Sequence, residues 1–481
     1  MSNYAHGISV EEKNTALVTP VTGSSGLQVV IGTAPIHLTK HPEAAVNVPI
    51  LCNEYSEAVE SLGYSTDFKK FTLGQSIFAN FLTFSVAPVV FINVLDPKKH
   101  KKENPEETYV VSGNQAMVNV EGILLDTLKV LNNTTELVKN VDYVAEFNSS
   151  GYVVISLVPG GAGDGANSIK VSSVSVDPEA VTPDDIIGGY EAEKGRYTGI
   201  ECVKIVRSKL GVTPGLLLAP GWSHIPAVAS ALDSKSTLSG SYRNENIVDI
   251  DTTRANVYTK VKEVKEEDGI TGVHTLACWP KVIVGGKELY YSALLGAMLA
   301  YTDAANDDCP NLSPSNKLVG IGGIVLEGGE EVNLEIIQAN TLNSFGVITA
   351  INDEGWRAWG NNMACYPAVT DVKDRWINCR RFFSWWGNTF INTFKSKVDD
   401  LMNNTLIETV VDTENIRGNS LVQEGKCAGA RMEYNPEDNP KAKLLDGKIK
   451  FKQYLAQFTP AESITNELEF DTDMLESAIN S

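Results

Sequence analysis

Histidine side chains can hold a metal, and two of those in this chain have a spacing that would suit one. The six histidines stand at positions 6, 37, 41, 100, 224 and 274. His37 and His41 are four residues apart, which would place two ligands on one face of a helix. Pro35 and Pro42 bracket the pair and disfavour a helix there. We therefore predict no metal site.

A second group of residues could serve acid–base catalysis. His224 and His274 could be catalytic in principle, but the sequence ties no serine or cysteine nucleophile to either of them. Asp249 and Asp251 end a predicted strand, where the catalytic carboxylates of α/β enzymes often lie. The same two residues precede a predicted helix and would also cap it. We favour the cap and predict no catalytic residue.

The motifs of nucleotide-binding and hydrolytic enzymes are missing. The sequence contains neither a GxSxG nucleophile elbow nor a GxxxxGK[ST] phosphate-binding loop. The glycine-rich run 160–165 follows a predicted strand and opens no helix, which is typical of a flexible turn. We therefore predict no cofactor and no enzymatic activity. An α/β hydrolase-like enzyme with a β-sandwich accessory domain is the alternative.

Charge and composition narrow the classes of partner. The chain has 481 residues, 60 of them acidic and 40 basic, and a formal net charge of −20. A nucleic-acid-binding surface needs clustered positive charge, so we predict no nucleic-acid partner. The longest nearly apolar stretch, 86–95, is well short of the roughly 20 residues of a membrane span, which predicts no membrane insertion. Scattered cysteines without a CxxC pair indicate reduced thiols in a protein made in a cytoplasm.

Two separated parts of the chain, residues 21–97 and 183–375, have the texture of one α/β core. Buried-strand runs at 27–32 and 89–95 flank a predicted helix over 67–87. In the second part, predicted strands and helices alternate from residue 198 onward. Such alternation predicts a mostly parallel or mixed sheet covered by helices.

Residues 98–182, between these two parts, have a different texture. A charged run, 98–103, is predicted to be a linker, and after it the sequence is rich in strands and poor in helices. Short strands at regular spacing, separated by Asn, Ser and Gly turns, predict an all-β sandwich domain inserted into the core. The predicted strands are 109–111, 117–120, 127–131, 143–147 and 152–157.

Residues 376–459 form a predicted C-terminal inner domain. Large apolar side chains recur every three or four residues from Phe383 to Leu401, which predicts one long amphipathic helix. The aromatic residues at its start could form a platform for a sugar or a base, but their helical spacing favours a role in the core. A strand is predicted near the end of this domain, with lysines that either face solvent or contact an acidic partner, namely Lys448, Lys450 and Lys452.

The two ends of the chain, residues 1–20 and 460–481, are predicted to be extended arms. Each carries a short strand pattern outside the apparent core. The second strand would either pair with the lysine-bearing strand of its own chain or dock on another subunit. The apolar residues of these patterns are Ile8 and Val10 in the first arm, and Ile464, Leu468 and Phe470 in the second.

Several segments resemble contractile tail sheath proteins, the family that includes myophage tail sheaths and the sheaths of phage-tail-like bacteriocins. The resemblance lies in the order and spacing of short motifs along nearly the whole chain. Asn362 and Met363 depart from it, because the family often carries Arg-Thr at these positions. The similar segments are 6–12, 29–34, 355–361, 377–383 and 459–464, the last being a Pro-Ala-Glu signature before the final strand.

The resemblance implies a structural protein. Family members form stacked six-fold rings around a tail tube, and their arms add strands to the sheets of neighbouring subunits. It thus implies that Ile8, Val10, Ile464, Leu468 and Phe470 link subunits. Contraction, which releases stored free energy without nucleotide, would drive the tube through a bacterial envelope.

The resemblance also implies the partners and the location of the protein. The partners would be further copies of this chain, a tail tube protein, and the baseplate and tail-terminator proteins. The protein would be assembled in the cytoplasm of a host bacterium and would lie in a virion tail or a tail-like particle. A capsid or baseplate subunit is a further alternative.

Overall fold

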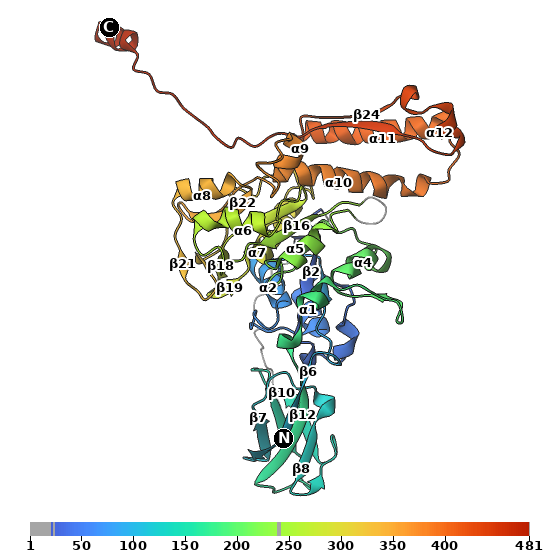
Figure 1. Cartoon of the computed structure of the whole chain (residues 1–481), viewed down its shortest axis with the longest axis vertical. Helices are drawn as coiled ribbons and strands as arrows, with labels where there is room; N and C mark the ends of the chain where they lie inside the picture. The colour runs from blue at the N-terminus through green and yellow to red at the C-terminus, as the bar shows by residue number, and fades with distance from the viewer. Residues whose placement is uncertain (1–20, 23–24, 238–241, 481) are drawn as a thin grey trace, which may run out of the picture.

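The computed structural model describes residues 21–22, 25–237 and 242–480. Along its longest axis the molecule has an all-β module at one end, an α/β core in the middle and a C-terminal lobe at the other end (Figure 1). From this lobe the last residues extend away from the rest of the chain. The predicted α/β core with a mixed sheet is confirmed.

The central sheet has the strand order β23-β22-β17-β16-β15-β2-β5-β3. Neighbouring strands from β22 to β5 are parallel, whereas β23 and β3 pair antiparallel at the two edges. Every residue of β2, β5 and β16 is buried, because helices cover both faces of the sheet. The strands are β2 Gln28–Gly32, β3 Ile50–Cys52, β5 Val89–Asn93, β15 Leu216–Leu218, β16 Glu245–Asp249, β17 Thr275–Cys278, β22 Val347–Asn352 and β23 Trp356–Trp359.

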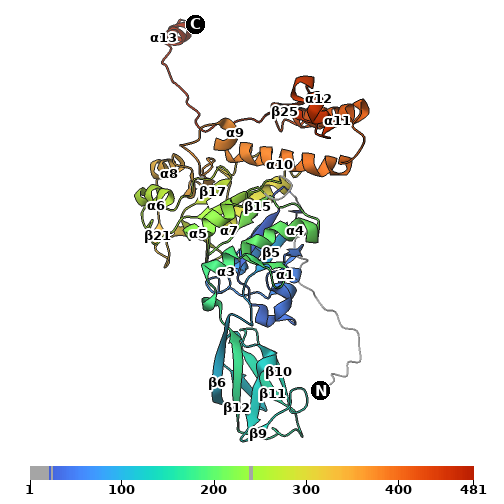
Figure 2. The same cartoon turned by 45° about the vertical axis from the view of Figure 1, so that its right-hand side comes forward.

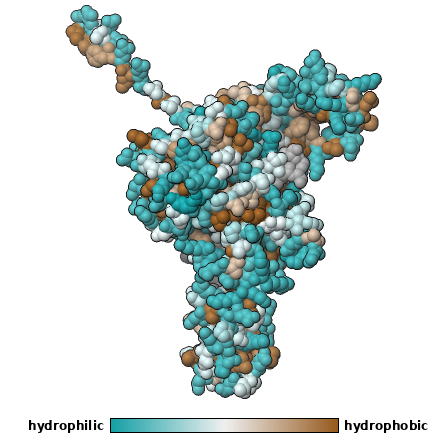
Figure 3. Space-filling model, in the orientation of Figure 1, coloured by the Kyte–Doolittle hydropathy of each residue, from teal (hydrophilic) through white to brown (hydrophobic). Residues whose placement is uncertain are grey.

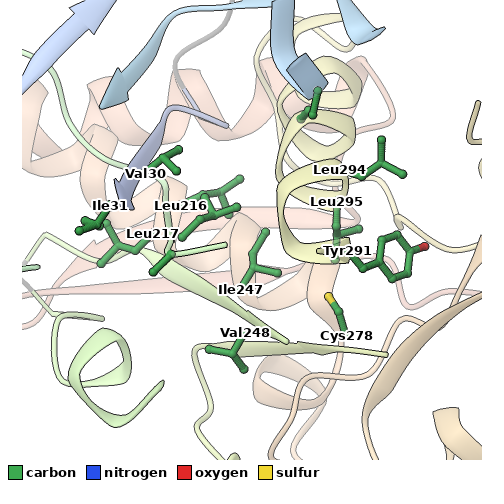
Figure 4. Close-up of a cluster of buried hydrophobic side chains, with 14 of the residues drawn as sticks. Val30, Ile31, Leu216, Leu217, Ile247, Val248, Cys278, Tyr291, Leu294 and Leu295 are labelled. Atoms are coloured by element: carbon green, nitrogen blue, oxygen red, sulfur yellow. The ribbon is translucent and has the colours of Figure 1, made fainter. Parts of the chain in front are cut away.

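The helix with the most buried side chains is α7, Tyr291–Ala304. It supplies Tyr291, Leu294 and Leu295 to a cluster with residues from four strands of the sheet (Figure 4). Among the described residues, no helix has the length and apolar character that crossing a bilayer requires. The other helices of the core are α1 Tyr55–Leu62, α3 Pro183–Ile187, α4 Val203–Leu210, α5 Pro226–Asp233, α6 Val261–Glu267 and α8 Ile336–Asn343.

The helix predicted over 67–87 is shorter and has a different period. Helix α2, Leu73–Ile77, continues directly into a π-helix, Phe78–Phe84, and a short strand, Val86–Ala87, follows. The wider π turn rotates later side chains away from the face expected for a period of 3.6 residues. The helical turns thus cover residues 73–84, and within them Phe81 is buried and Leu82 is exposed.

The all-β module, residues 101–176, consists of two sheets with the orders β10-β11-β7 and β6-β12-β8-β9. Buried and less buried residues alternate along strands such as β11, so one face of each sheet packs inward. The module has a hydrophobic cluster of its own, separate from that of the core. Its strands are β6 Lys101–Val110, β7 Gln115–Val118, β8 Lys129–Asn132, β9 Thr135–Glu136, β10 Tyr143–Phe147, β11 Val153–Leu157 and β12 Ser168–Val176.

The chain enters and leaves the β module through the antiparallel strands β6 and β12 (Figure 2). The prediction that 98–103 is a linker is therefore wrong, because β6 begins at Lys101. Its lysine and glutamate side chains are compatible with a strand at the solvent-exposed edge of a sheet. A further link to the core is the ion pair between Lys70 Nζ and Glu121 Oε2, 2.6 Å apart.

The C-terminal lobe contains helices α10 and α11 and a two-stranded sheet, β24-β25. Phe382 and Trp386 of α10 are buried in a third hydrophobic cluster, which confirms that these aromatic residues belong to a core. The predicted helix up to Leu401 ends early, because a 3-10 turn at 395–397 and left-handed Asp399 break it and leave Val398 and Leu401 exposed. The elements are α10 Ile377–Phe394, α11 Asn404–Gln423, β24 Gly429–Tyr434, α12 Lys441–Leu445 and β25 Phe451–Ala456.

Candidate docking surfaces

The two histidines considered for catalysis lie apart. His224 follows the carboxyl end of β15, whereas His274 precedes the amino end of β17. Because these strands run parallel, the two histidines lie at opposite ends of the strands of the sheet. The His224 ring stacks on Tyr290 with ring centroids 5.3 Å apart, and burial lowers the pKa of His224. His274 Nδ1 lies 3.3 Å from Glu245 Oε1. The two imidazoles therefore do not form one site.

Asp249 is buried at the end of β16 and holds elements together. Its carboxylate accepts hydrogen bonds from Ser223 Oγ at 2.8 Å and from the backbone N–H of Ser292 at 2.9 Å. Burial raises the pKa of this carboxyl, against the effect of these hydrogen bonds. The expected cap of the following helix is wrong for Asp249, because Ser292 lies in the first turn of the more distant α7, which packs beside β16.

The histidine pair considered for a metal is also separated by its environment. His37 is buried between Phe71 of the core and Phe147 of the β module, with ring centroids 5.8 Å from each. His41 is exposed. Within the described ranges, no group of three His, Cys, Asp or Glu side chains could hold a metal ion.

The C-terminal arm, residues 460–481, presents unpartnered apolar side chains. Ile464, Leu468 and Phe470 are 87%, 87% and 73% exposed, on a segment that belongs to no helix or strand. The arm leaves the lobe and ends in a short helix, α13, Thr472–Ile479, whose end carries apolar residues (Figures 1 and 3). Ile8 and Val10 of the N-terminal arm lie outside the described residues.

The base of the C-terminal arm is fixed by an ion pair. Arg375 Nη2 donates to Glu462 Oε2 at 2.8 Å, and Arg375 Nε donates to Asn362 Oδ1 at 2.9 Å. The Arg375 guanidinium also lies over the rings of Trp376 and Tyr366, at 3.9 and 4.3 Å from their centroids. We call this arrangement the Glu462 clasp. Asn362 is thus part of the Glu462 clasp.

The lysine hairpin, residues 429–456, is the second candidate surface. Strands β24 and β25 pair antiparallel, with Gly429 opposite Ala456 and Tyr434 opposite Phe451. In the described part of the chain this sheet has no third strand, so each strand has one edge without a partner strand. Main-chain groups at such an edge can accept an added strand.

The lysines of the hairpin are placed differently from the prediction. Lys452 lies in β25, but Lys448 and Lys450 precede it. The Asn439 side chain causes this, since it accepts from the Lys450 N–H at 2.7 Å and donates to the Lys450 carbonyl at 2.8 Å. The N–H and the carbonyl of Lys450 therefore bind the Asn439 side chain and not a neighbouring strand. Lys450 Nζ lies 3.1 Å from Asp438 Oδ1, and Lys448 Nζ lies 3.7 Å from Asp446 Oδ2.

Two of these features were not predicted from the sequence. Helix α13 has a signal that could have revealed it, because Asp471 is a good N-cap and precedes apolar residues at helical spacing. The Glu462 clasp joins residues 87 positions apart, and no local pattern indicates such a pair.

Comparisons with known proteins bear on the role of these surfaces. No protein-family model matches the sequence. The chain is 25% identical to the "Tail sheath protein" of Burkholderia phage BcepMu, over 98% of each chain. It is also 25% identical to the "Major tail sheath protein" of Serratia phage KSP20, over 74% of this chain and 86% of that one. This chain is a homologue of contractile tail sheath proteins.

Solved structures share the fold of this sheath homologue along its length. A chain of the anti-feeding prophage baseplate has a TM-score of 0.60 at 13% identity, covering 98% of this chain and 100% of that one. A chain of the contracted PVC sheath complex, an extracellular contractile injection system, has a TM-score of 0.55 at 12% identity, covering 98% and 99%. At these identities the likeness concerns the fold.

Proposed function

We propose that this chain is the structural subunit of a contractile tail sheath, which polymerises around a tail tube and contracts to drive the tube through a bacterial envelope. The observation that carries this proposal is the relationship to a phage tail sheath protein over 98% of both chains. The fold shared with chains of contractile injection systems supports it. The protein acts by assembly and movement, not by catalysis.

The arms link the subunits of this sheath. Ile464, Leu468 and Phe470 are exposed on a segment without secondary structure, and the lysine hairpin offers strand edges to which such a segment can pair. Ile8 and Val10 act in the same way at the other end of the chain. Lys448, Lys450 and Lys452 contact the acidic residues of an incoming arm.

The partners follow from this assembly. Copies of the chain stack as six-fold rings in a helical sheath, with a tail tube inside and baseplate and tail-terminator proteins at the ends. The sheath is assembled in the cytoplasm of a host bacterium and belongs to a virion tail or a phage-tail-like bacteriocin. The β module, an inserted sandwich at the end of the molecule opposite the C-terminal lobe, faces outward from this particle.

Negative-stain microscopy of the purified full chain tests the proposal. We expect long tubular sheaths of regular width, because the arms can join each copy to its neighbours without limit. Discrete closed particles or monomers, under conditions in which the protein stays folded, would contradict it.

A further inference from the structure

Helix α13, at the very end of the C-terminal arm, has an apolar face that the described chain leaves uncovered. Met474 and Ile479 are 71% and 73% exposed, and Leu475 is 49% exposed. These three positions share one side of the helix, and Asp473 and Glu476 flank that side. Asp471 caps the helix by accepting from the N–H groups of Asp473 and Met474, both at 2.9 Å.

A helix of this length needs a partner surface. It has 8 residues, and isolated helices shorter than about 12–15 residues are marginal in water. In both views α13 stands away from the lobe from which the arm extends (Figures 1 and 2). Because the described residues leave this face exposed, we assign its packing partner to another molecule.

Charge decides which surface can receive it. The arm contains six acidic residues and no basic one, at positions 462, 467, 469, 471, 473 and 476. Since the whole chain carries a net charge of −20, most of the surface of a second copy repels the arm. A basic patch next to an exposed apolar side chain would instead bind both the acidic and the apolar residues of α13.

Helix α12 of the lysine hairpin offers that combination. Leu445, at its end, is 77% exposed. Lys441 and Lys443 are exposed beside it, and neither forms an ion pair with another described residue. Lys448 follows three residues after Leu445, and Asp446, its ion-pair partner at 3.7 Å, lies between them. Leu445 therefore lies in a segment in which the lysines outnumber the acidic residues.

The geometry of strand addition brings the two helices together. Helix α12 lies in the connection between Tyr434, the last residue of β24, and Phe451, the first of β25. An arm strand antiparallel to β25 would run toward this connection. From Phe470 to Leu475 the chain can span at most about 17 Å, so α13 would lie close to the end of the hairpin.

We propose that α13 docks on α12 of a second copy of this chain, with Met474, Leu475 and Ile479 against Leu445, and with Asp473 and Glu476 toward the lysines. The arm then has two anchors, a strand and a terminal helix. This inference rests on the proposed sheath assembly, in which the arm of one copy reaches another.

Cross-linking between variants that each carry one introduced cysteine tests the contact. The seven native cysteines are all buried, so cysteines introduced at exposed positions 475 and 445 are the ones that a short bis-maleimide reaches. Full-length Leu475→Cys and Leu445→Cys proteins are assembled together and treated with the reagent. We expect a covalent dimer in the mixture that neither variant gives alone. Val141→Cys, at an exposed site in the β module, replaces Leu445→Cys as the control and should give no dimer.

Charge exchange supplies a second measurement. Glu476→Lys and Lys443→Glu should each lower the yield of the cross-linked dimer about two- to fivefold, and combining them should restore it. Tubes that form normally without any 475–445 product, or with an equal yield from the Val141→Cys control, overturn this inference alone. Failure of the unmodified chain to form tubes contradicts the proposed function instead.

Discussion

At the scale of single residues, a substitution at Leu468 should affect subunit assembly without affecting the folding of the monomer. Its side chain is almost fully exposed, so the monomer gains little from it. If it is buried in a subunit joint, it contributes about 1.5–3 kcal/mol there. Leu468→Asp should therefore abolish tubes while the melting temperature of the monomer stays within about 1 °C, as measured by microscopy and calorimetry on the same preparation.

The matched control for this change is Val141→Asp, another exposed apolar residue, in the β module. It should leave both tubes and melting temperature unchanged. A clear drop in melting temperature for Leu468→Asp would instead favour pairing of the arm with the hairpin of its own chain.

The Glu462 clasp fixes where the C-terminal arm begins. Besides the ion pair to Arg375, the Phe458 carbonyl accepts from Asn378 Nδ2 at 3.2 Å. Beyond Glu462, the exposed residues 463–470 form no helix or strand. The clasp therefore marks where the arm leaves the lobe.

Loss of the clasp can be measured by proteolysis of the monomer. Chymotrypsin cuts after aromatic residues, and Phe458 lies at the clasp whereas Phe470 lies in the exposed arm. Glu462→Ala should raise the rate of cutting at Phe458 relative to Phe470 about two- to fivefold, because a partly exposed ion pair contributes at most about 1 kcal/mol. An unchanged ratio would show that Glu462 does not hold the arm.

At the scale of elements, the N-terminal arm gives the complementary prediction. Residues 1–20 precede the first core strand, β2, and the alternation around Ile8 and Val10 indicates a strand outside the core. Deleting residues 1–18 should leave a soluble protein with the circular dichroism spectrum and melting temperature of the full chain, because terminal segments contribute little to burial. Tubes should no longer form. Long tubes from the deleted protein would remove the linking role of this arm.

The sequence predicts best those helices and strands whose position depends mainly on the burial of apolar side chains. The apolar runs at 27–32 and 89–95 correspond to strands β2 and β5 of the structure. They are recognisable because strands covered on both faces need continuous apolar residues. The helix predicted over 67–87 is shorter in the structure, where α-helical and π-helical turns cover residues 73–84. Strand β25 starts later than predicted, since a side chain distant in sequence, Asn439, binds the backbone of Lys450.

The candidate docking surfaces were predictable only in part. Exposed apolar residues in the C-terminal arm can be found from alternation beyond Pro460. The edges that would receive them depend on which strands pair, which is a property of the folded lobe. The Glu462 clasp depends in the same way on a contact between residues 87 positions apart.

At the scale of the whole molecule, His37 reports on the junction between the α/β core and the β module. Burial lowers its pKa to about 4, against an opposing effect of Glu121. The unfolded chain, with a histidine pKa near 6.5, binds this proton more readily than the folded chain. Stability should therefore fall as pH decreases from about 6.5 toward 4.

Comparison with His37→Phe isolates this contribution. Between pH 7 and pH 5 the unmodified protein should lose about 2 kcal/mol of unfolding free energy through His37, and the variant should lose that much less. Denaturant titrations at the two pH values measure the difference. His41→Phe, at an exposed position, serves as the control and should follow the unmodified protein. Equal pH dependence in all three proteins would mean that His37 stays accessible to protons.

The β module can be excised where it joins the α/β core, between His100 and Asp177, if it is a separate folding unit. The Asp177 N–H donates to the His100 carbonyl at 2.9 Å, so the ends left by excising residues 101–176 are neighbours that a short Gly-Ser linker can join. The module has its own hydrophobic cluster, but excision also removes Val176 from the main core and uncovers His37.

We therefore expect the excised protein to be soluble and to melt a few degrees below the full chain, because only the contacts at the junction are lost. If the module faces outward from the sheath, the excised protein should still form tubes, with a smaller outer diameter in negative stain and an unchanged inner one. Insoluble protein would show that the module is part of the core. Soluble monomers without tubes would place the module between subunits, because the core and the C-terminal arm would then be intact and unable to assemble.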